Sequence, residues 1–234
     1  IDSLHRDSLA KITTAGDFAQ AALGTDTVIT LENDLIRVAL TNKGAQIKSV
    51  TLKKYSTSDS AAVVLAKDNQ MGYAVNTADN KTAQTSELYF TPSAPVTSAD
   101  GSVSVKFVLS SNVGQSIVHT YTLRPGAYAV DWNIELVGAN KLLTGGMLNF
   151  KWLAQTSQLE RTAAYERQMS NICFSEGNEF DYISSNTEKT FEKPVQWIGV
   201  VQQFFNTTVI AKEGFSAGAV HWSRFTDRDR KSVV

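Results

Sequence analysis

IVHTYTLRPGAYAVDWNIEL, residues 117–136, is the stretch whose alternating side chains decide the predicted fold. Side chains of a β-strand point alternately to the two faces of a sheet. The stretch contains two runs with this period of two, and each run has one face rich in large side chains. That face carries Ile117, His119, Tyr121 and Leu123 in the first run, and Tyr128, Val130, Trp132, Ile134 and Leu136 in the second.

The residues between the two runs, Arg124-Pro125-Gly126-Ala127, are typical of a tight turn. Proline fixes φ near the value that the second position of a turn needs, and glycine tolerates a positive φ after it. We therefore predict a hairpin at the heart of an antiparallel sheet, with the rest of the chain covering it. The residues that define this core hairpin are Tyr121, Leu123, Pro125, Gly126, Tyr128, Val130, Trp132 and Ile134.

Short runs of the same kind occur along most of the chain and predict about ten or more strands. Such a series is typical of a large, twisted, antiparallel β-sandwich, so the predicted class is all-β with little helix. The predicted strands include residues 28–31, 35–41, 46–52, 63–65, 71–75, 88–90, 103–109, 147–153 and 195–210, with a last one near Val220, Trp222 and Phe225. The core residues expected in the 195–210 run are Trp197, Val201, Phe204 and Phe205.

Residues 1–24 lack the strand pattern and predict a tether or a frayed helix lying on the domain. A chain of 234 residues suits one large β domain, so we expect residues 25–234 to form a single domain. Because the sequence begins at Ile1, we expect it to be a processed product or a piece of a longer protein. No signal peptide is visible.

The charge balance argues against several classes of partner. The chain has 22 basic and 23 acidic side chains and a net charge of −1, whereas nucleic-acid binding needs a concentrated positive surface. There is no polybasic patch for an anionic membrane, and no apolar run near the roughly 20 residues of a membrane-spanning helix. One cysteine, Cys173, excludes an internal disulfide and is expected to be a small buried side chain.

We find no catalytic, metal-binding or cofactor-binding constellation, and expect no enzymatic activity. The histidines, His5, His119 and His221, are scattered, and no serine elbow, Cys/His pair or phosphate loop accompanies them. We expect each to be a packed or surface side chain. A carboxylate pair for sugar chemistry stays open as a minor alternative, from Glu160 and Glu166 or from Glu176, Glu179 and Asp181.

Residues 154–194 lose the strand alternation, and five aromatic residues are dispersed among their charges. Two interpretations stay open: the segment folds back and tucks its rings into the edge of the sandwich, or some of the rings contact a partner. The candidate partner-binding residues are Tyr165, Phe174, Phe180, Tyr182 and Phe191.

Three blocks resemble one family, and they occur in its order and spacing. They are residues 32–55 (ENDLIRVALTNKGAQIKSVTLKKY), 121–136 (YTLRPGAYAVDWNIEL) and 194–210 (PVQWIGVVQQFFNTTVI). Together they are similar to the large periplasmic domain of YidC-type membrane protein insertases of Gram-negative bacteria. Gln196 departs from the family, in which glycine commonly precedes the tryptophan. Residues 56–101 and the tail after Ala211 match poorly, and the chain is expected to stop short of the last family strands.

The resemblance implies a β-supersandwich similar to galactose mutarotase, in the periplasm, as a soluble domain of an inner-membrane protein whose membrane helices are absent here. It implies a role in inserting and folding inner-membrane proteins, alone or with the Sec translocon, and carries over no catalytic residue. The implied partners are nascent membrane proteins and an accessory Sec subunit. The implied docking region is a sheet edge and the segment from Tyr165 to Pro194.

Two other functions remain as alternatives. A carbohydrate-binding or mutarotase-like domain would share the implied architecture, although fold alone does not carry function. Such a domain would be expected to depend on His119 or His221. A passive spacer that only joins membrane helices is the third hypothesis.

Overall fold

The chain folds into two compact units of antiparallel β-sheet, unit 1 (residues 1–157) and unit 2 (residues 158–234). The computed structural model describes residues 2–67, 69–78, 81–185 and 187–223. The predicted all-β class with mostly antiparallel sheets is confirmed. The single domain over residues 25–234 stays a prediction. Phe225 and the charged residues 227–231 lie outside the described residues.

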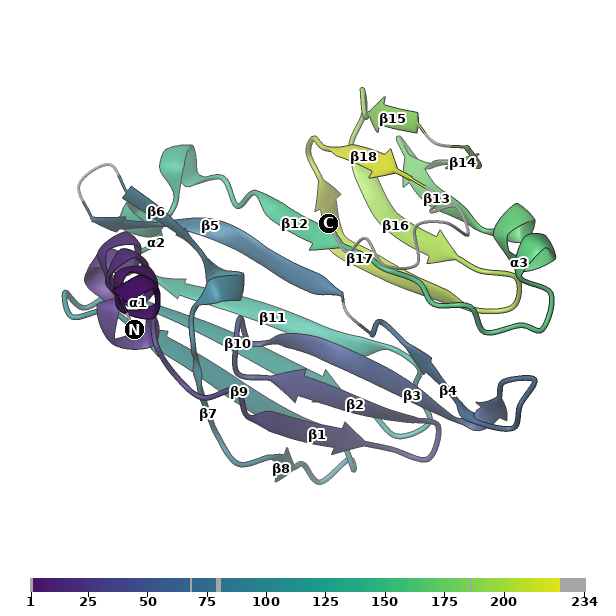
Figure 1. Ribbon diagram of the computed structural model, residues 1–234, viewed down its shortest axis with the longest axis horizontal. Coiled ribbons are helices and arrows are strands. Elements are labelled where there is room, and N and C mark those ends of the chain that lie inside the picture. Colours follow the sequence, from purple (N-terminus) through teal and green to yellow (C-terminus); the bar gives the residue numbers. More distant parts are fainter. Residues whose placement is uncertain (1, 68, 79–80, 186, 224–234) are drawn as a thin grey trace. The chain divides into compact units, whose positions relative to one another are not determined.

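The described residues of unit 1 form three sheets (Figure 1). The first has the order β1-β2-β3-β4: β1 (Val28–Glu32), β2 (Ile36–Thr41), β3 (Gln46–Ser56) and β4 (Ala62–Leu65). The second has the order β11-β10-β9-β7, with β8 also paired to β9: β7 (Thr91–Pro92), β8 (Val96–Thr97), β9 (Val103–Ser110), β10 (Ser116–Leu123) and β11 (Val130–Val137). The third has the order β12-β5-β6: β5 (Gln70–Ala78), β6 (Lys81–Gln84) and β12 (Phe150–Leu153).

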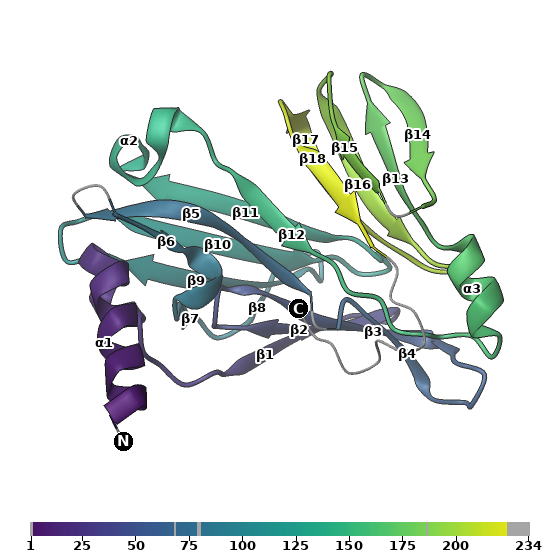
Figure 2. The same cartoon turned by 45° about the horizontal axis from the view of Figure 1, so that its top comes forward.

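The core of unit 1 lies between the β7–β11 sheet and the layer that contains β2 and β5 (Figures 1 and 2). The alternation read from the sequence places the core residues, because every second side chain of β2, β9 and β10 is buried. Burial of these apolar side chains is the main force that holds the two layers together. They include Ile36, Val38, Leu40, Val105, Phe107, Leu109, Ile117, Tyr121 and Leu123.

The predicted hairpin forms, but its second strand is not at the heart of the sheet. β10 lies between β9 and β11, whereas β11 is the last strand of the sheet and has one neighbour. Its large side chains, Trp132 and Ile134 among them, are therefore only half-buried. Tyr128 precedes the strand and is exposed, contrary to its expected place on the buried face. Tyr121 and Leu123 on β10 are buried as expected.

The turn of this hairpin is held by the turn between β1 and β2. Gly126 has φ +65°, as the turn requires, and its N–H donates to Asp34 Oδ1 at 2.9 Å. The Asn33 Nδ2 donates to the carbonyls of Arg124 at 2.7 Å and Ala127 at 2.8 Å. Two of the sequence blocks that carry the family resemblance therefore meet through their turn residues.

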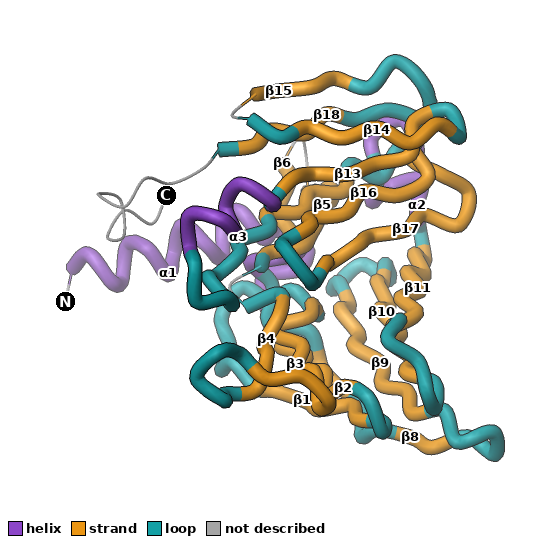
Figure 3. Tube along the Cα trace, turned by 90° about the vertical axis from the view of Figure 1, so that its right-hand side faces the viewer, coloured by secondary structure: helices purple, strands orange, loops and turns teal. Residues whose placement is uncertain are grey.

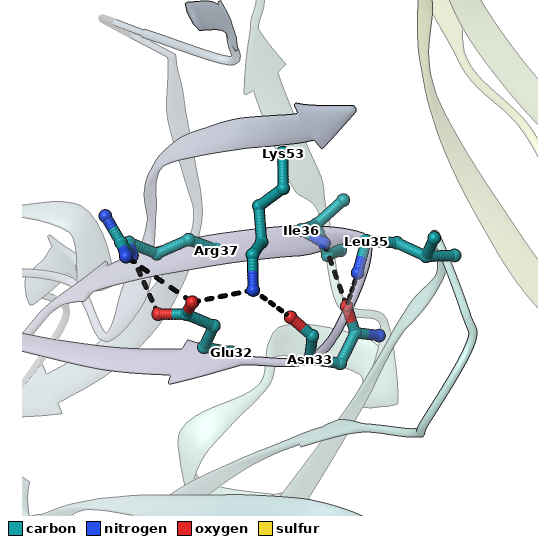
Figure 4. A network of polar contacts seen from close by, with 6 residues as sticks. All are labelled: Glu32, Asn33, Leu35, Ile36, Arg37 and Lys53. Carbon is teal, nitrogen blue, oxygen red and sulfur yellow. Dashed lines mark hydrogen bonds and ion pairs between the residues drawn. The ribbon is translucent and has the colours of Figure 1, made fainter. Parts of the chain in front are cut away.

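Asn33 also closes its own turn, and ion pairs surround it on the surface (Figure 4). Its Oδ1 accepts the N–H groups of Leu35 and Ile36, each at 2.8 Å. The neighbouring Glu32 carboxylate pairs with Arg37 Nε and Lys53 Nζ, each at 2.8 Å. The pKa of Glu32 is lowered to about 2, chiefly by the hydrogen bond from Arg37. One polar network thus joins the β1–β2 turn, the β10–β11 turn and the second half of β3.

The N-terminal segment of unit 1 is helical and packs on the β part of the unit. α1 (Asp2–Ala15) continues into the 3-10 helix η1 (Gly16–Ala21), whose Phe18 side chain is buried. The Thr77 hydroxyl donates to the carbonyl of Thr14 at 2.9 Å, and the N–H of Tyr89 donates to the carbonyl of Ala21 at 2.8 Å. The C-terminal half of this segment is therefore fixed to β5 and to the chain that precedes β7.

Two predicted strands of unit 1 are shorter or absent. The predicted strand 88–90 follows the 3-10 helix η2 (Thr85–Glu87) and makes only an isolated bridge between Tyr89 and Lys43. The predicted strand 147–153 is reduced to β12, because α2 (Ala139–Leu142) and η3 (Thr144–Gly146) fill the preceding connection.

The part of unit 2 that the structure describes forms a four-stranded sheet and a two-stranded one. In the larger sheet, β14, β13, β16 and β17 lie side by side in that order (Figure 3). The elements of the unit are α3 (Ala163–Met169), β13 (Asn171–Glu176), β14 (Glu179–Ile183), β15 (Thr187–Thr190), β16 (Val195–Val201), β17 (Asn206–Phe215) and β18 (Ala219–Trp222). β15 pairs with β18. The segment from 163 to 190, predicted to be irregular, thus contains α3, β13, β14 and β15.

Candidate functional site

A hairpin of β13 and β14 builds the candidate site in unit 2. Gly177 and Asn178 join the two strands, and both have a positive φ, 59° and 66°. Two-residue hairpin turns need this conformation because it matches the twist of the strands. Gln196 braces the turn: its Oε1 accepts the Ser175 hydroxyl at 2.9 Å and the Asn178 N–H at 3.2 Å. The residue that departs from the family pattern therefore has a local structural role.

The five aromatic residues predicted to contact a partner fall into two groups. Phe174 and Phe191 are buried, with ring centroids 5.0 Å apart, and form the core of unit 2 together with Val195. The Lys189 ammonium lies 5.5 Å from the ring centroid of Phe174 and 5.9 Å from that of Phe191. Two members of the predicted set are thus core residues, as the alternative interpretation expected, and offer no surface to a partner.

The other three aromatic residues are exposed, and two of them lie together on β14. Phe180 is 65% exposed and Tyr182 is 54% exposed, with ring centroids 6.4 Å apart. Tyr165 lies on α3. Large apolar rings exposed on the outermost strand of a sheet are unusual for a surface that contacts only water.

Strand register adds two side chains from β16 and β17 to the exposed rings. On β13, Ser175 is opposite Phe180 on one side and Trp197 on the other, and Trp197 is in turn opposite Ile210 on β17. The ring centroids of Phe180 and Trp197 are 6.1 Å apart. We call Phe180, Tyr182, Trp197 and Ile210 the aromatic face.

The rest of the predicted core strand is less buried than expected. Trp197, Val201 and Phe205 are half-buried, and Phe204, in the turn between β16 and β17, is 68% exposed. The alternation indicates which residues share a face of β16, but not whether another element covers that face.

The opposite side of β14 is acidic. Glu179 and Asp181 alternate with the two aromatic residues and line an open hollow of about 290 Å³ together with Glu176, Phe180, Glu192 and Lys193. The Glu176 carboxylate forms an ion pair with Lys189 Nζ at 3.0 Å and accepts a hydrogen bond from the N–H of Lys193 at 3.1 Å. The hydrogen bond from Lys189 is the main cause that lowers the pKa of Glu176.

The structural role of Glu166 is not visible in the sequence. Its carboxylate is buried and accepts the N–H of Leu159 at 3.1 Å, the N–H of Glu160 at 3.2 Å and the Gln202 Nε2 at 3.1 Å. Its acceptor sites are therefore used to tie the chain before α3 to the end of β16. The candidate pair of Glu160 and Glu166 does not present two open carboxylates.

His119, named for the sugar-processing alternative, is 1% exposed in the core of unit 1. One ring nitrogen, Nδ1, lies 3.0 Å from the Ala45 carbonyl, and Nε2 lies 2.8 Å from the Tyr73 hydroxyl. A carbonyl only accepts, so Nδ1 carries the proton and Nε2 accepts from Tyr73. Burial lowers the pKa of His119 to about 4. His119 is thus a satisfied core histidine without access to a substrate.

The other residues considered for catalysis or metal binding, His221, His5 and Cys173, do not form a common site in the described part of the chain. His221 is exposed on β18, and the side chain of His5 lies outside the described residues. Cys173 is half-buried, and burial raises the pKa of its thiol. Among the described residues, no His, Cys, Asp and Glu side chains form a group that would hold a metal ion. No described helix has the length and apolar character needed to cross a membrane.

Comparison with known proteins shows the same family over most of the chain. Residues 28–229 match the family model described as YidC periplasmic domain. A protein of Parabacteroides distasonis named membrane protein insertase YidC is 30% identical over 209 residues, covering 86% of this chain and 32% of that protein. The protein of that name from Cytophaga hutchinsonii is 33% identical over 206 residues, covering 85% of this chain and 33% of the relative. The chain thus spans about a third of the length of these relatives.

Proposed function

The chain belongs to the family of YidC periplasmic domains, and from this premise we propose that it is a non-catalytic docking module of a membrane protein insertase. In this proposal it works in the periplasm, attached to the inner membrane through parts of the insertase outside this sequence. Its partners are nascent membrane proteins and accessory subunits of the Sec translocon. The insertion activity belongs to the whole insertase, of which this chain is one part.

The observation that carries the proposal is the aromatic face at the open edge of unit 2. Phe180 and Tyr182 are large, exposed and adjacent, and Trp197 extends them across the sheet. Aromatic side chains are enriched among the few residues that supply most of the binding energy of protein interfaces. The hollow lined by Glu179 and Asp181, beside these rings, is open and mostly acidic. Such a surface suits contact with a partner more than enclosure of a small substrate.

The proposal predicts that removing the two β14 rings weakens partner binding. In the double variant Phe180→Ala/Tyr182→Ala, the Kd for a purified periplasmic domain of a Sec accessory subunit should rise about 10–100-fold. Calorimetry measures this Kd, and the same variant in the full-length insertase should insert membrane proteins less efficiently.

Phe204→Ala is the matched control, because Phe204 is as exposed as Phe180, lies in the same unit and is not part of the aromatic face. Its Kd should stay within about threefold of the wild-type value. An unchanged Kd in the folded double variant would contradict the assignment of the aromatic face. Normal insertion after deletion of the whole domain would favour a passive spacer instead.

A further inference from the structure

We infer that the segment which docks on β14 is an extended strand in which basic and apolar side chains alternate. The inference rests on the proposed docking function and specifies the chemistry of the partner. Three properties of the described part of unit 2 lead to it: the edge position of β14, the separation of its side chains onto two faces, and the excess of carboxylates on one of them.

The edge position favours a partner in extended conformation. β14 is the last strand of the order β14-β13-β16-β17, and β13 is its neighbour in the described sheet. An edge strand has N–H and C=O groups that point away from the sheet, and an added strand can pair with them. A hydrogen-bonded strand would lie beside Phe180 and Tyr182 along its whole length.

The alternation on β14 assigns each side chain of such a strand to one of two environments. Phe180 and Tyr182 point to the aromatic face, and Glu179 and Asp181 point to the opposite face. Both carboxylates line the acidic hollow, which Phe180 borders from its own side. Side chains directly opposite each other on adjacent strands contact one another. Every second residue of the partner would therefore meet a ring, and the residues between them would meet carboxylates.

The charge of the hollow favours basic residues at those intermediate positions. Among the residues that the structure describes, no ion pair within 4.0 Å engages Glu179, Asp181 or Glu192, whereas Lys189 is held by Glu176. Asp181 Oδ1 instead accepts the N–H of Tyr182 at 2.8 Å. A basic side chain of the partner would draw this carboxylate away and free the N–H for a partner carbonyl. Acidic side chains would be repelled at the same place.

The test uses three synthetic peptides of equal length: one alternating Val and Lys, one alternating Val and Glu, and one with the Val and Lys residues in two blocks. The alternating basic peptide should bind the wild-type chain at least about tenfold more tightly than either of the others. Its affinity should fall as the salt concentration rises. N-methylation of its backbone at every second residue, in the register that faces β14, should abolish binding.

The variant Glu179→Lys/Asp181→Lys should reverse the preference, so that the Val and Glu peptide binds more tightly than the Val and Lys peptide. Glu188→Lys is the control, since Glu188 is exposed on β15 of the same unit and does not line the hollow. It should leave the preference unchanged. Asp181→Asn keeps a side-chain acceptor beside the Tyr182 N–H and should lower the preference about threefold or more without refolding β14.

Equal binding of the basic and acidic peptides would overturn the inferred chemistry. If the Phe180→Ala/Tyr182→Ala variant still failed to bind the Sec accessory domain in that case, docking on the aromatic face would stand. Only the proposed charge pattern of the partner would then be wrong. If that variant bound the Sec accessory domain as tightly as the wild type does, while the basic peptide bound the wild type with the expected preference, the peptide site would stand. The proposed partner would then be wrong.

Discussion

Replacement of Glu166 by alanine is expected to lower the free energy of unfolding of unit 2 by roughly 3–5 kcal/mol. The side chain is 4% exposed, and its oxygens accept hydrogen bonds from two backbone N–H groups and from Gln202. Alanine would leave these buried donors without an acceptor, and each unsatisfied donor costs about 1–3 kcal/mol. Urea unfolding followed by circular dichroism measures the loss.

Two further variants separate the hydrogen bonds from the loss of charge. Glu166→Gln keeps one acceptor oxygen but turns an amide group toward the N–H donors, so it should cost about half as much as alanine. Glu160→Gln is the control, because only the backbone N–H of Glu160 takes part in the network, and it should change stability by less than about 0.5 kcal/mol. Equal stability of Glu166→Ala and the wild type would show that the carboxylate does not hold unit 2 together.

Acidification should destabilise unit 1 through His119. Burial lowers the pKa of this histidine from 6.5 to about 4 in the folded chain. Between these values the unfolded chain binds a proton that the folded chain rejects, so the free energy of unfolding falls as the pH falls from 6.5 toward 4. The total loss amounts to roughly 3 kcal/mol, and it levels off below the folded pKa.

The variant His119→Gln isolates this contribution, because glutamine does not titrate. Its unfolding free energy should be lower than that of the wild type at pH 7, since the bonds to Tyr73 and Ala45 are disturbed, but nearly constant between pH 6.5 and pH 5. His221→Gln, at an exposed position, should keep the wild-type decline. A wild-type stability that is flat from pH 6.5 to pH 5 would refute the neutral, buried state of His119.

Much of unit 1 could be predicted from alternation alone. Ile36, Val38 and Leu40, like Ile117 and Tyr121, are buried as their spacing predicted, because a one-residue shift would turn every one of them to the other face. Alternation does not reveal which strand ends a sheet, however. β11 has a clear alternation of apolar and polar residues and yet is an edge strand, so its apolar face is half-covered.

The candidate site was harder to predict because its strands are short and its signals are local. Gly177 and Asn178 form a recognisable two-residue hairpin turn, and reading it as one would have predicted β13 and β14. The sequence does not show which of the five aromatic residues are buried and which are exposed. Phe174 pairs with Asp181 and Phe180 pairs with Ser175, so the two rings lie on opposite faces of neighbouring strands. The pairing places the two rings on opposite faces, and their burial shows that Phe174 faces the core and Phe180 faces outward. The bonds of Glu166 join distant residues and left no sequence pattern.

Amide hydrogen exchange of the chain, with and without a bound periplasmic domain of a Sec accessory subunit, tests the docking surface most directly. The proposal predicts that binding slows exchange at the amides of Phe180 and Tyr182 on β14, because they become covered and hydrogen-bonded. Protection confined to unit 1, with β14 exchanging as fast as in the free chain, would contradict it.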